Sequence, residues 1–336
     1  MKKLIGFLTI AMLTVCGFTG CRPGPKPESA DALQIVVTIF PEYDWVRNIL
    51  GNNPAGAEVT MLLDSGVDLH SYQPTAEDMM KIANSDLFVY VGGESDEWVD
   101  GVLRGTPNEK RITVNLLEAL GDRAKEEEIV EGMEEDGDHD HHDHDADEEH
   151  HDGEEEGPEY DEHVWLSLRN AVVLVDRLAQ ALAGADPANA ETYARNAVSY
   201  TEKLKALDAE YQATVDNAPV KTLLFGDRFP FRYLTDDYGL DYYAAFVGCS
   251  AETEASFETI TFLARKADEL SLHAVMTIEG ANHKIAETIV QNTKSKDQRI
   301  LSLDSMQSVT AEGAQSGAGY LPVMEKNLAV LKDALQ

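Results

Sequence analysis

The segment that decides the fold reads DPANAETYARNAVSYTEKLKALDAEYQATVDNA, residues 186–218. Asp186 and Pro187 supply a helix N-cap followed by proline at the first helical position, and no helix breaker follows before Pro219. At 1.5 Å per residue, such a helix is roughly 45 Å long. We therefore expect one stiff helix that runs along two lobes and holds them together. Apolar side chains recur in it in steps of three and four: Tyr193, Ala197, Tyr200, Leu204, Leu207 and Tyr211.

On both sides of this helix, short β-branched runs alternate with helical patterns. This alternation predicts an α/β protein with two lobes, each containing a mostly parallel four-stranded sheet flanked by helices. The clearest early helix starts at Ala76, with Thr75 as N-cap and Asp78 in the capping-box position. Further helices are expected at 169–183 and 320–335. The expected strands are 34–40, 59–63, 87–92 and 111–116 in the first lobe, and 222–226, 242–248, 274–280 and 299–304 in the second.

These patterns divide the chain into segments of different character. We expect a signal peptide, a tether, an N-terminal α/β lobe that contains a disordered loop (126–160), a helical connector and a C-terminal α/β lobe. The corresponding residues are 1–20, 21–32, 33–167, 168–218 and 219–336.

The N-terminus has the features of an export signal. Two lysines after Met1 precede an apolar stretch, residues 4–15, that is too short to span a bilayer. The small residues before Cys21 resemble a bacterial lipobox, which predicts lipid attachment at Cys21, although Phe18 departs from the usual aliphatic residue there. Ordinary signal-peptidase cleavage is the alternative, and Cys16 is a poorer candidate. With Cys21 lipidated, Cys249 is the only other cysteine of the mature protein and has no partner for an internal disulfide.

An acidic, histidine-rich segment interrupts the first lobe. Residues 126–162 contain 21 acidic side chains and six histidines but no lysine or arginine. Imidazoles interleaved with carboxylates offer many overlapping sites for zinc-like cations, and the alternative is a merely solvated acidic spacer. We expect an auxiliary metal-collecting loop that cannot form a core of its own. Its histidines are His139, His141, His142, His144, His150 and His151.

Charge and length exclude some classes of function. The formal net charge is −34, which argues against nucleic acids and polyanionic substrates as partners. Without the leader and the acidic loop, roughly 280 residues remain, enough for two medium-sized domains with proper cores.

Candidate ligands follow several predicted strands, at the sheet edge where open α/β sheets bind ligands. His70 lies in the loop after 59–63, and His163 lies just before a helix. Asp227 follows the strand 222–226 of the second lobe, and Glu279 follows the β-branched stretch 274–278 at the end of another. Each residue alone has an ordinary explanation, because His70 could be a surface residue, His163 a packed core residue and Glu279 a helix cap. Together they predict a site for a borderline-soft cation in the crevice between the lobes. His273 is interpreted as structural, and His283 as a possible outer contact.

From about residue 33 to 335, the chain resembles the metal-binding lipoproteins of bacterial ABC importers for zinc and manganese. The segments that carry the resemblance are GVDLHSYQPTAEDMMKIANSDLFVYVGG, DEHVWLSLRNA, DPANAETYARNAVSYTEKLKALD and TIEGANHKIAETIV. A loop rich in histidine and acid before the second histidine motif is typical of the zinc branch. The resemblance implies that His70, His163 and Glu279 are metal ligands and that Asp161 orients His163.

The chain departs from this family at the third histidine. Where the family has Phe-His-Asp, this chain reads Phe225-Gly226-Asp227, so three protein ligands remain. Asp227, a water molecule or a loop histidine could complete the site, while the guanidinium of Arg228 would oppose a cation. We expected Gly226→His to tighten zinc binding. Leu69 and Glu162 are smaller departures, since proline commonly precedes each histidine.

The resulting prediction is a membrane-anchored extracytoplasmic receptor that captures Zn²⁺ and delivers it to an ABC permease and its ATPase, as a monomer without enzymatic activity. Zinc is favoured over Mn²⁺ because imidazoles dominate the candidate ligands. The alternatives are a receptor for manganese or another divalent metal, a cell-surface metal buffer or adhesin, and a zinc-dependent hydrolase. The hydrolase is disfavoured because the sequence has no HExxH motif.

Overall fold

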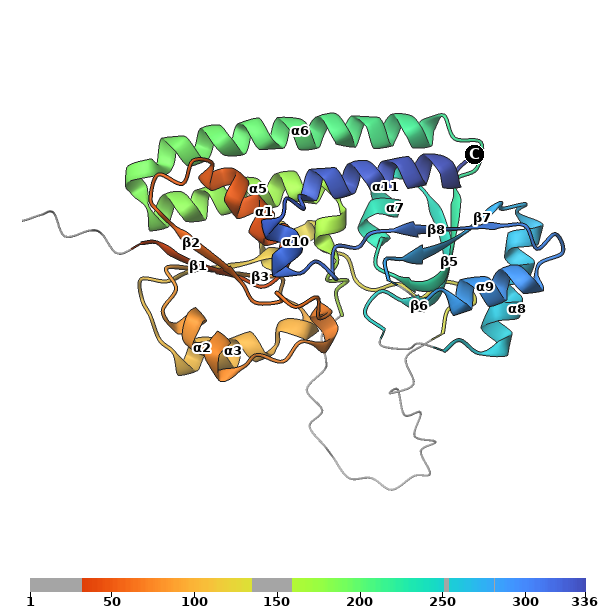
Figure 1. The fold of residues 1–336 in the computed structure, drawn as a ribbon, viewed down its shortest axis with the longest axis horizontal. Helices are drawn as coiled ribbons and strands as arrows, with labels where there is room; N and C mark the ends of the chain where they lie inside the picture. The colour runs from red at the N-terminus through yellow and green to blue at the C-terminus, as the bar shows by residue number, and fades with distance from the viewer. Residues whose placement is uncertain (1–31, 135–158, 251–253, 281) are drawn as a thin grey trace, which may run out of the picture. The chain divides into compact units, whose positions relative to one another are not determined.

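Two four-stranded sheets form the frame of the computed structural model, which describes residues 32–134, 159–250, 254–280 and 282–336 (Figure 1). The N-terminal sheet has the strand order β2-β1-β3-β4 and the C-terminal sheet the order β6-β5-β7-β8. All strand pairings in both sheets are parallel. The strands are β1 (Gln34–Val37), β2 (Glu58–Met61), β3 (Leu87–Tyr90), β4 (Ile112–Asn115), β5 (Thr222–Phe229), β6 (Asp241–Val247), β7 (Ala274–Ile278) and β8 (Arg299–Leu303).

Helices connect the strands and cover the sheets. The α-helices are α1 (Phe40–Leu50), α2 (Ala76–Ala83), α3 (Trp98–Gly105), α4 (Leu116–Leu120), α5 (Leu168–Ala185), α6 (Ala190–Asp216), α7 (Arg232–Tyr238), α8 (Phe257–Glu269), α9 (Lys284–Asn292), α10 (Ala311–Gln315) and α11 (Tyr320–Ala334). Short 3₁₀ helices are η1 (Leu69–Ser71), η2 (Glu94–Asp96), η3 (Gly121–Arg123), η4 (Val164–Leu166) and η5 (Pro187–Asn189).

The predicted α/β architecture is confirmed, with a correction at β5. We expected this strand to end at residue 226, but it continues to Phe229 beside β6 after a register irregularity between Phe225 and Arg228. Asp227 therefore lies inside the strand and not beyond its end. The predicted capping box at α2 is present, since Thr75 and Asp78 hydrogen-bond each other's backbone NH groups.

The long connecting helix, α6, contains 27 residues, which corresponds to about 40 Å. It starts slightly later than predicted. Asp186 accepts hydrogen bonds from Asn189 and from the hydroxyl of Tyr193 (2.7 and 2.6 Å), and this holds the first residues as the 3₁₀ turn η5. Beyond this turn, α6 packs along α5 and contacts both α1 from the N-terminal half and α11 from the C-terminal half (Figure 1).

One hydrophobic core extends through both sheets and the connecting helices, and a smaller one lies in the C-terminal half, around α8 and α9. Leu33–Gln336 form a single compact unit, and the predicted lobe boundaries inside it stay predictions. Within the described ranges, no helix has the length and apolar character needed to cross a membrane. The predicted signal peptide, Cys21 and the six histidines of the acidic loop lie outside the described residues.

Candidate metal centre

His70 is positioned by a short 3₁₀ turn after β2. Asp68 caps this turn, η1, by accepting a hydrogen bond from the backbone NH of His70 (3.1 Å). Leu69 anchors the turn because its side chain is buried. The imidazole Nδ1 lies 2.8 Å from the hydroxyl of Ser95 and 3.3 Å from Oε2 of Glu162. These contacts turn Nε2 of His70 away from Ser95 and Glu162.

His163 is fully buried immediately before η4. Asp161 Oδ1 accepts a hydrogen bond from the backbone NH of His163 at 2.8 Å and lies 3.0 Å from its Nδ1. Trp165, also buried, donates its indole NH to the backbone carbonyl of Ser305 in the C-terminal half (2.9 Å). The contact between Asp161 and His163 that the sequence predicted is therefore present.

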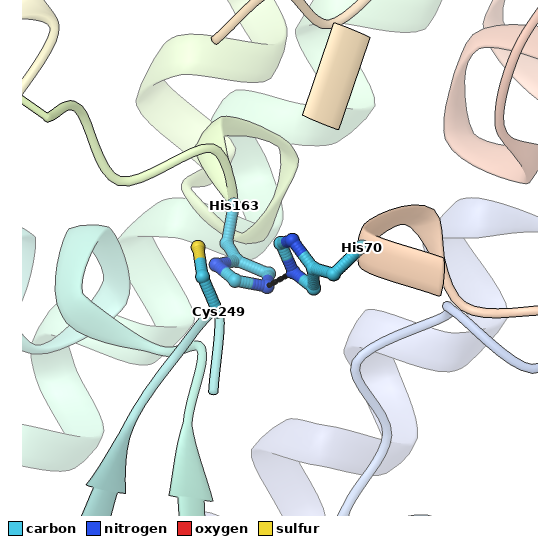
Figure 2. A group of neighbouring side chains, drawn as sticks. All are labelled: His70, His163 and Cys249. Carbon is cyan, nitrogen blue, oxygen red and sulfur yellow. Dashed lines mark hydrogen bonds between the residues drawn. The ribbon is translucent and has the colours of Figure 1, made fainter. Parts of the chain in front are cut away.

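The two imidazoles meet through their Nε2 atoms, which are 3.2 Å apart (Figure 2). A carboxylate accepts hydrogen bonds but has no proton to donate, so Asp161 and Glu162 favour the tautomers with hydrogen on Nδ1. In these tautomers both Nε2 atoms present lone pairs, which a cation between them would satisfy. Two nitrogens bound to tetrahedral zinc at 2.0–2.1 Å would lie about 3.3 Å apart, so this pair already has the required separation.

Cys249 adds a third donor from the C-terminal half. It follows β6, and one potential ligand atom each from His70, His163 and Cys249 lies within 4.8 Å of the other two (Figure 2). Burial raises the pKa of the Cys249 thiol well above its usual range, and the carboxylates of Asp161, Glu127 and Glu162 raise it further. The thiol is therefore protonated without a cation, whereas coordination to zinc deprotonates a thiol.

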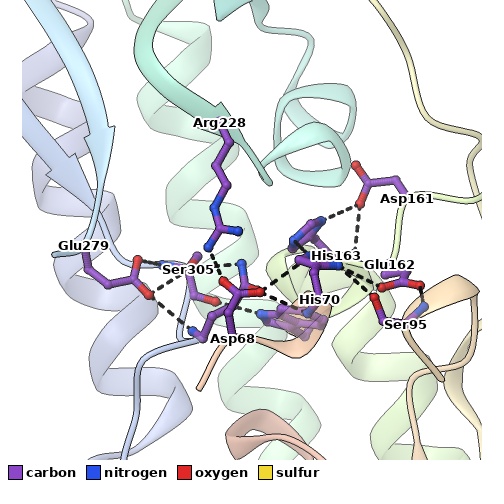
Figure 3. A network of polar contacts seen from close by, with 11 residues as sticks. Asp68, His70, Ser95, Asp161, Glu162, His163, Arg228, Glu279 and Ser305 are labelled. Carbon is purple, nitrogen blue, oxygen red and sulfur yellow. Dashed lines mark hydrogen bonds and ion pairs between the residues drawn. The ribbon is translucent and has the colours of Figure 1, made fainter. Parts of the chain in front are cut away.

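Glu279, which follows β7 directly, is held by the segment after β8 and not by the histidines. Its carboxylate accepts hydrogen bonds from the backbone NH and hydroxyl of Ser305 (2.6 and 2.8 Å), from the Gln307 backbone NH (3.2 Å) and from the Ser308 hydroxyl (3.4 Å) (Figure 3). It is not part of the described group of potential ligands. Metal ligation by Glu279 would require it to exchange these contacts.

Asp227 also points elsewhere. Its Oδ1 accepts a hydrogen bond from the Arg228 backbone NH and its Oδ2 one from the Ile278 backbone NH. Burial raises the pKa of its carboxyl group. Asp227 therefore connects β5 to β7 and lies outside the histidine and cysteine group.

The surroundings of Gly226 argue against a vacant ligand position there and against our expectation for Gly226→His. A Cβ atom at residue 226 would lie 2.6 Å from Cα and 2.8 Å from the backbone nitrogen of Ala286. Its side-chain direction thus points into α9, on the same face of β5 as Leu224, which belongs to one buried cluster with Ala286.

The side chain that β5 does send towards the centre is Arg228, which forms an ion pair with Asp68 (Figure 3). Although burial opposes the effect, this guanidinium holds the pKa of Asp68 below its usual value. Asp68 Oδ1 is 3.9 Å from Nε2 of His70. The positive charge is therefore paired across the two halves, and an oxygen donor lies next to the histidine pair.

Sequence reasoning missed the roles of Ser95, Glu162 and Cys249. Glu162 was noted only because it stands where proline is common, whereas it is buried beside His70. Cys249 could have been found, because it follows a predicted strand just as His70 does. Ser95 gave no signal in the sequence. The residue interpreted as structural, His273, bonds the carbonyl of Asp333 through Nε2 (3.0 Å).

Comparisons with known proteins identify a family and relatives that are named for zinc. The family model described as zinc-uptake complex component A, periplasmic (ZnuA), matches residues 35–334. The zinc-binding lipoprotein AdcA of Streptococcus pneumoniae serotype 4 is 32% identical over 335 residues, which are 99% of this chain and 61% of AdcA. The high-affinity zinc uptake system protein ZnuA of Bacillus subtilis is 29% identical over 338 residues, 99% of this chain and 98% of that protein. The chain thus spans about three fifths of the length of the streptococcal relatives.

Solved structures show the same fold. The Zn(II)-bound ZnuA-like domain of Streptococcus pneumoniae AdcA superposes with a TM-score of 0.68 at 28% identity, covering 90% of this chain and 98% of that domain. The metal-dependent lipoprotein YcdH of Bacillus subtilis gives a TM-score of 0.70 at 26% identity, with coverage of 90% and 99%. Since the family model spans almost all of the chain beyond its N-terminal segment, the protein belongs to the ZnuA family of zinc-uptake complex components.

Proposed function

We propose that this protein is an extracytoplasmic zinc receptor that binds Zn²⁺ at His70 and His163 and delivers it to an ABC importer. The observation that carries the proposal is the facing pair of Nε2 atoms, 3.2 Å apart, with each Nδ1 held near a carboxylate. Such outer contacts fix the tautomer of a metal-binding imidazole and raise its basicity. The names of AdcA and ZnuA, both zinc proteins, support the same cargo.

Zinc is the preferred cargo because of the donor types at this centre. Imidazole and thiolate suit zinc, whereas manganese prefers carboxylate, carbonyl and water oxygens. The centre binds its metal without catalysing a reaction, and the permease and ATPase of the importer are the partners. Glu279 and Asp227 remain predicted ligands, but their hydrogen bonds to other segments argue against them.

The acidic loop has a defined base beside the centre. The backbone NH of Asp161 donates to the carbonyl of Lys125 (2.8 Å), and the NH of Glu127 donates to the carbonyl of Glu159 (2.9 Å). The segment leaving this base reaches His163 two residues after Asp161. We infer that the loop collects zinc weakly at several sites and releases it next to His163.

Lipid attachment at Cys21 would anchor the monomeric receptor to the bacterial membrane. Acyl chains attached there would hold the protein at the membrane surface. Cys21→Ser should therefore move the protein from the membrane fraction to the soluble fraction in cell fractionation. Continued tight association of this variant with membranes would contradict the proposed anchor.

Metal titration of the purified mature chain, with zinc and manganese in competition, tests the binding function. We expect one tight zinc equivalent and several weaker ones, and deletion of residues 136–156 should remove only the weaker ones. His70→Ala and His163→Ala should each abolish the tight equivalent. His273→Ala is the matched control, because its imidazole bonds a backbone carbonyl elsewhere. Tight binding that survives both alanine substitutions would refute the site.

A further inference from the structure

We propose that the Cys249 thiolate is a third protein ligand of the metal held by His70 and His163. This inference rests on the proposed function, because it assigns one more donor to the same centre. The resulting donor set contains two imidazoles and one thiolate, with His70 from the N-terminal half and Cys249 from the C-terminal half.

The distances are close to those of a tetrahedral zinc site. Zinc bonds of 2.0–2.1 Å to nitrogen and 2.3 Å to sulfur imply a nitrogen–sulfur separation of about 3.6 Å. The potential ligand atoms of the three residues already lie within 4.8 Å of one another. Ligation would bring the sulfur from within this range to about 3.6 Å from each bound nitrogen, and the thiol would exchange its hydrogen bond with Glu127 for the bond to the metal.

The backbone before Cys249 is built for a close approach to His163. A Cβ atom on Gly248 would lie 3.0 Å from Cε1 of His163 and 2.9 Å from the carbonyl oxygen of Phe229. Glycine thus lets the chain pass directly against the imidazole, and the next residue presents its sulfur there (Figure 2). Any larger residue at 248 would push Cys249 away from the histidines.

In the C-terminal half, β5 places no metal-binding side chain at the centre, so a donor from another strand would complete the site. Position 226 faces α9, and the side chain that reaches the centre is Arg228, which cannot bind a cation. The neighbouring strand, β6, ends at the same edge of the sheet. A donor placed just after β6 can therefore replace one missing from β5. A thiolate also favours zinc over manganese.

Cobalt(II) is a suitable probe, because thiolate ligation to cobalt produces a sulfur-to-cobalt charge-transfer band in the near ultraviolet. In a background where Cys16 and Cys21 are serine, Cys249 is the only thiol of the chain. One bound cobalt equivalent should show this band, and Cys249→Ser should lose it while still binding cobalt. The zinc affinity of Cys249→Ser should fall about 10–100-fold or more, because the loss of a residue that only hydrogen-bonds a metal ligand already has an effect of this size.

The controls separate this inference from the proposed function. The loop histidines cannot produce a sulfur band, so weak loop binding does not disturb the readout. One cobalt equivalent without the band, together with unchanged zinc affinity in Cys249→Ser, would overturn Cys249 as a ligand and leave the histidine site intact. If His70→Ala keeps both the band and full zinc affinity, the proposed histidine site itself fails. Loss of the band in His70→Ala supports both the histidine site and the ligand role of Cys249.

Discussion

Replacing Gly226 by alanine tests whether position 226 faces α9 and not the metal centre. The added methyl group would lie 2.6 Å from Cα and 2.9 Å from Cβ of Ala286, roughly 1 Å inside a normal carbon contact of about 3.5 Å. Ala286 is fully buried in α9, so the neighbour is backbone that cannot rotate aside. Overpacking of this kind costs about 1–3 kcal/mol.

Thermal unfolding of the metal-free protein measures this cost. At this scale, 1 kcal/mol shifts Tm by about 2–4 °C, so Gly226→Ala should lower Tm by roughly 2–12 °C. Gly101→Ala is the matched control, because a Cβ there meets nothing within 4 Å. Alanine at this position inside α3 should stabilise by about 0.5–1 kcal/mol.

Zinc binding gives the second readout for the same position. Gly226→His should destabilise the fold further without tightening zinc binding, because its imidazole cannot reach His70 and His163. Wild-type stability in Gly226→Ala, combined with tighter zinc binding in Gly226→His, would refute the direction assigned to residue 226.

Three further substitutions probe the surroundings of the centre and the core. Arg228→His should tighten zinc binding about 10-fold or more, measured by competition with a chelator. The substitution removes a positive charge, releases Asp68 from its ion pair and adds an imidazole. Unchanged affinity would mean that residue 228 of β5 does not reach the metal. Asp161→Asn should weaken zinc binding about 10–100-fold in the same assay, and an equally large effect of Asp122→Asn, at an exposed carboxylate, would point to general charge loss. Burial raises the pKa of Glu42 from 4.5 to about 8, so the folded state retains a proton that the unfolded chain releases, and stability should fall as the pH rises from 4.5 to 8. Glu42→Gln should flatten this slope in urea unfolding at several pH values, and an identical slope in both proteins would contradict the buried neutral acid.

Much of the architecture was predictable because its signals are local. The alternation of β-branched runs and amphipathic helices predicted both sheets, since periodicity is set by residues close in sequence. The uninterrupted pattern after Asp186 predicted α6. His70 and His163 were predictable because each is placed by its own turn after a recognisable segment.

The composition of the centre was less predictable, because it depends on side-chain direction. Glu279 follows β7 as predicted, yet its carboxylate is bound by Ser305 and its neighbours, 26 or more residues later in the chain. Ser95 holds His70 from 25 residues away. Such pairs form only when separate loops meet, and nothing in either local pattern specifies its partner.

The sequence by itself determined the fold class, the long connecting helix and the two histidines, whereas the tertiary structure decided which other side chains join them. At β5, Gly226 faces α9 on the same side as Leu224, and after the register irregularity between Phe225 and Arg228 the side chain of Arg228 reaches Asp68. At β6, the close passage of Gly248 past His163 brings Cys249 into the group. The physical reason is that side chains alternate between the two faces of a strand, so an irregularity of this kind can redirect the side chains that follow it, and only the packed sheet fixes where it falls.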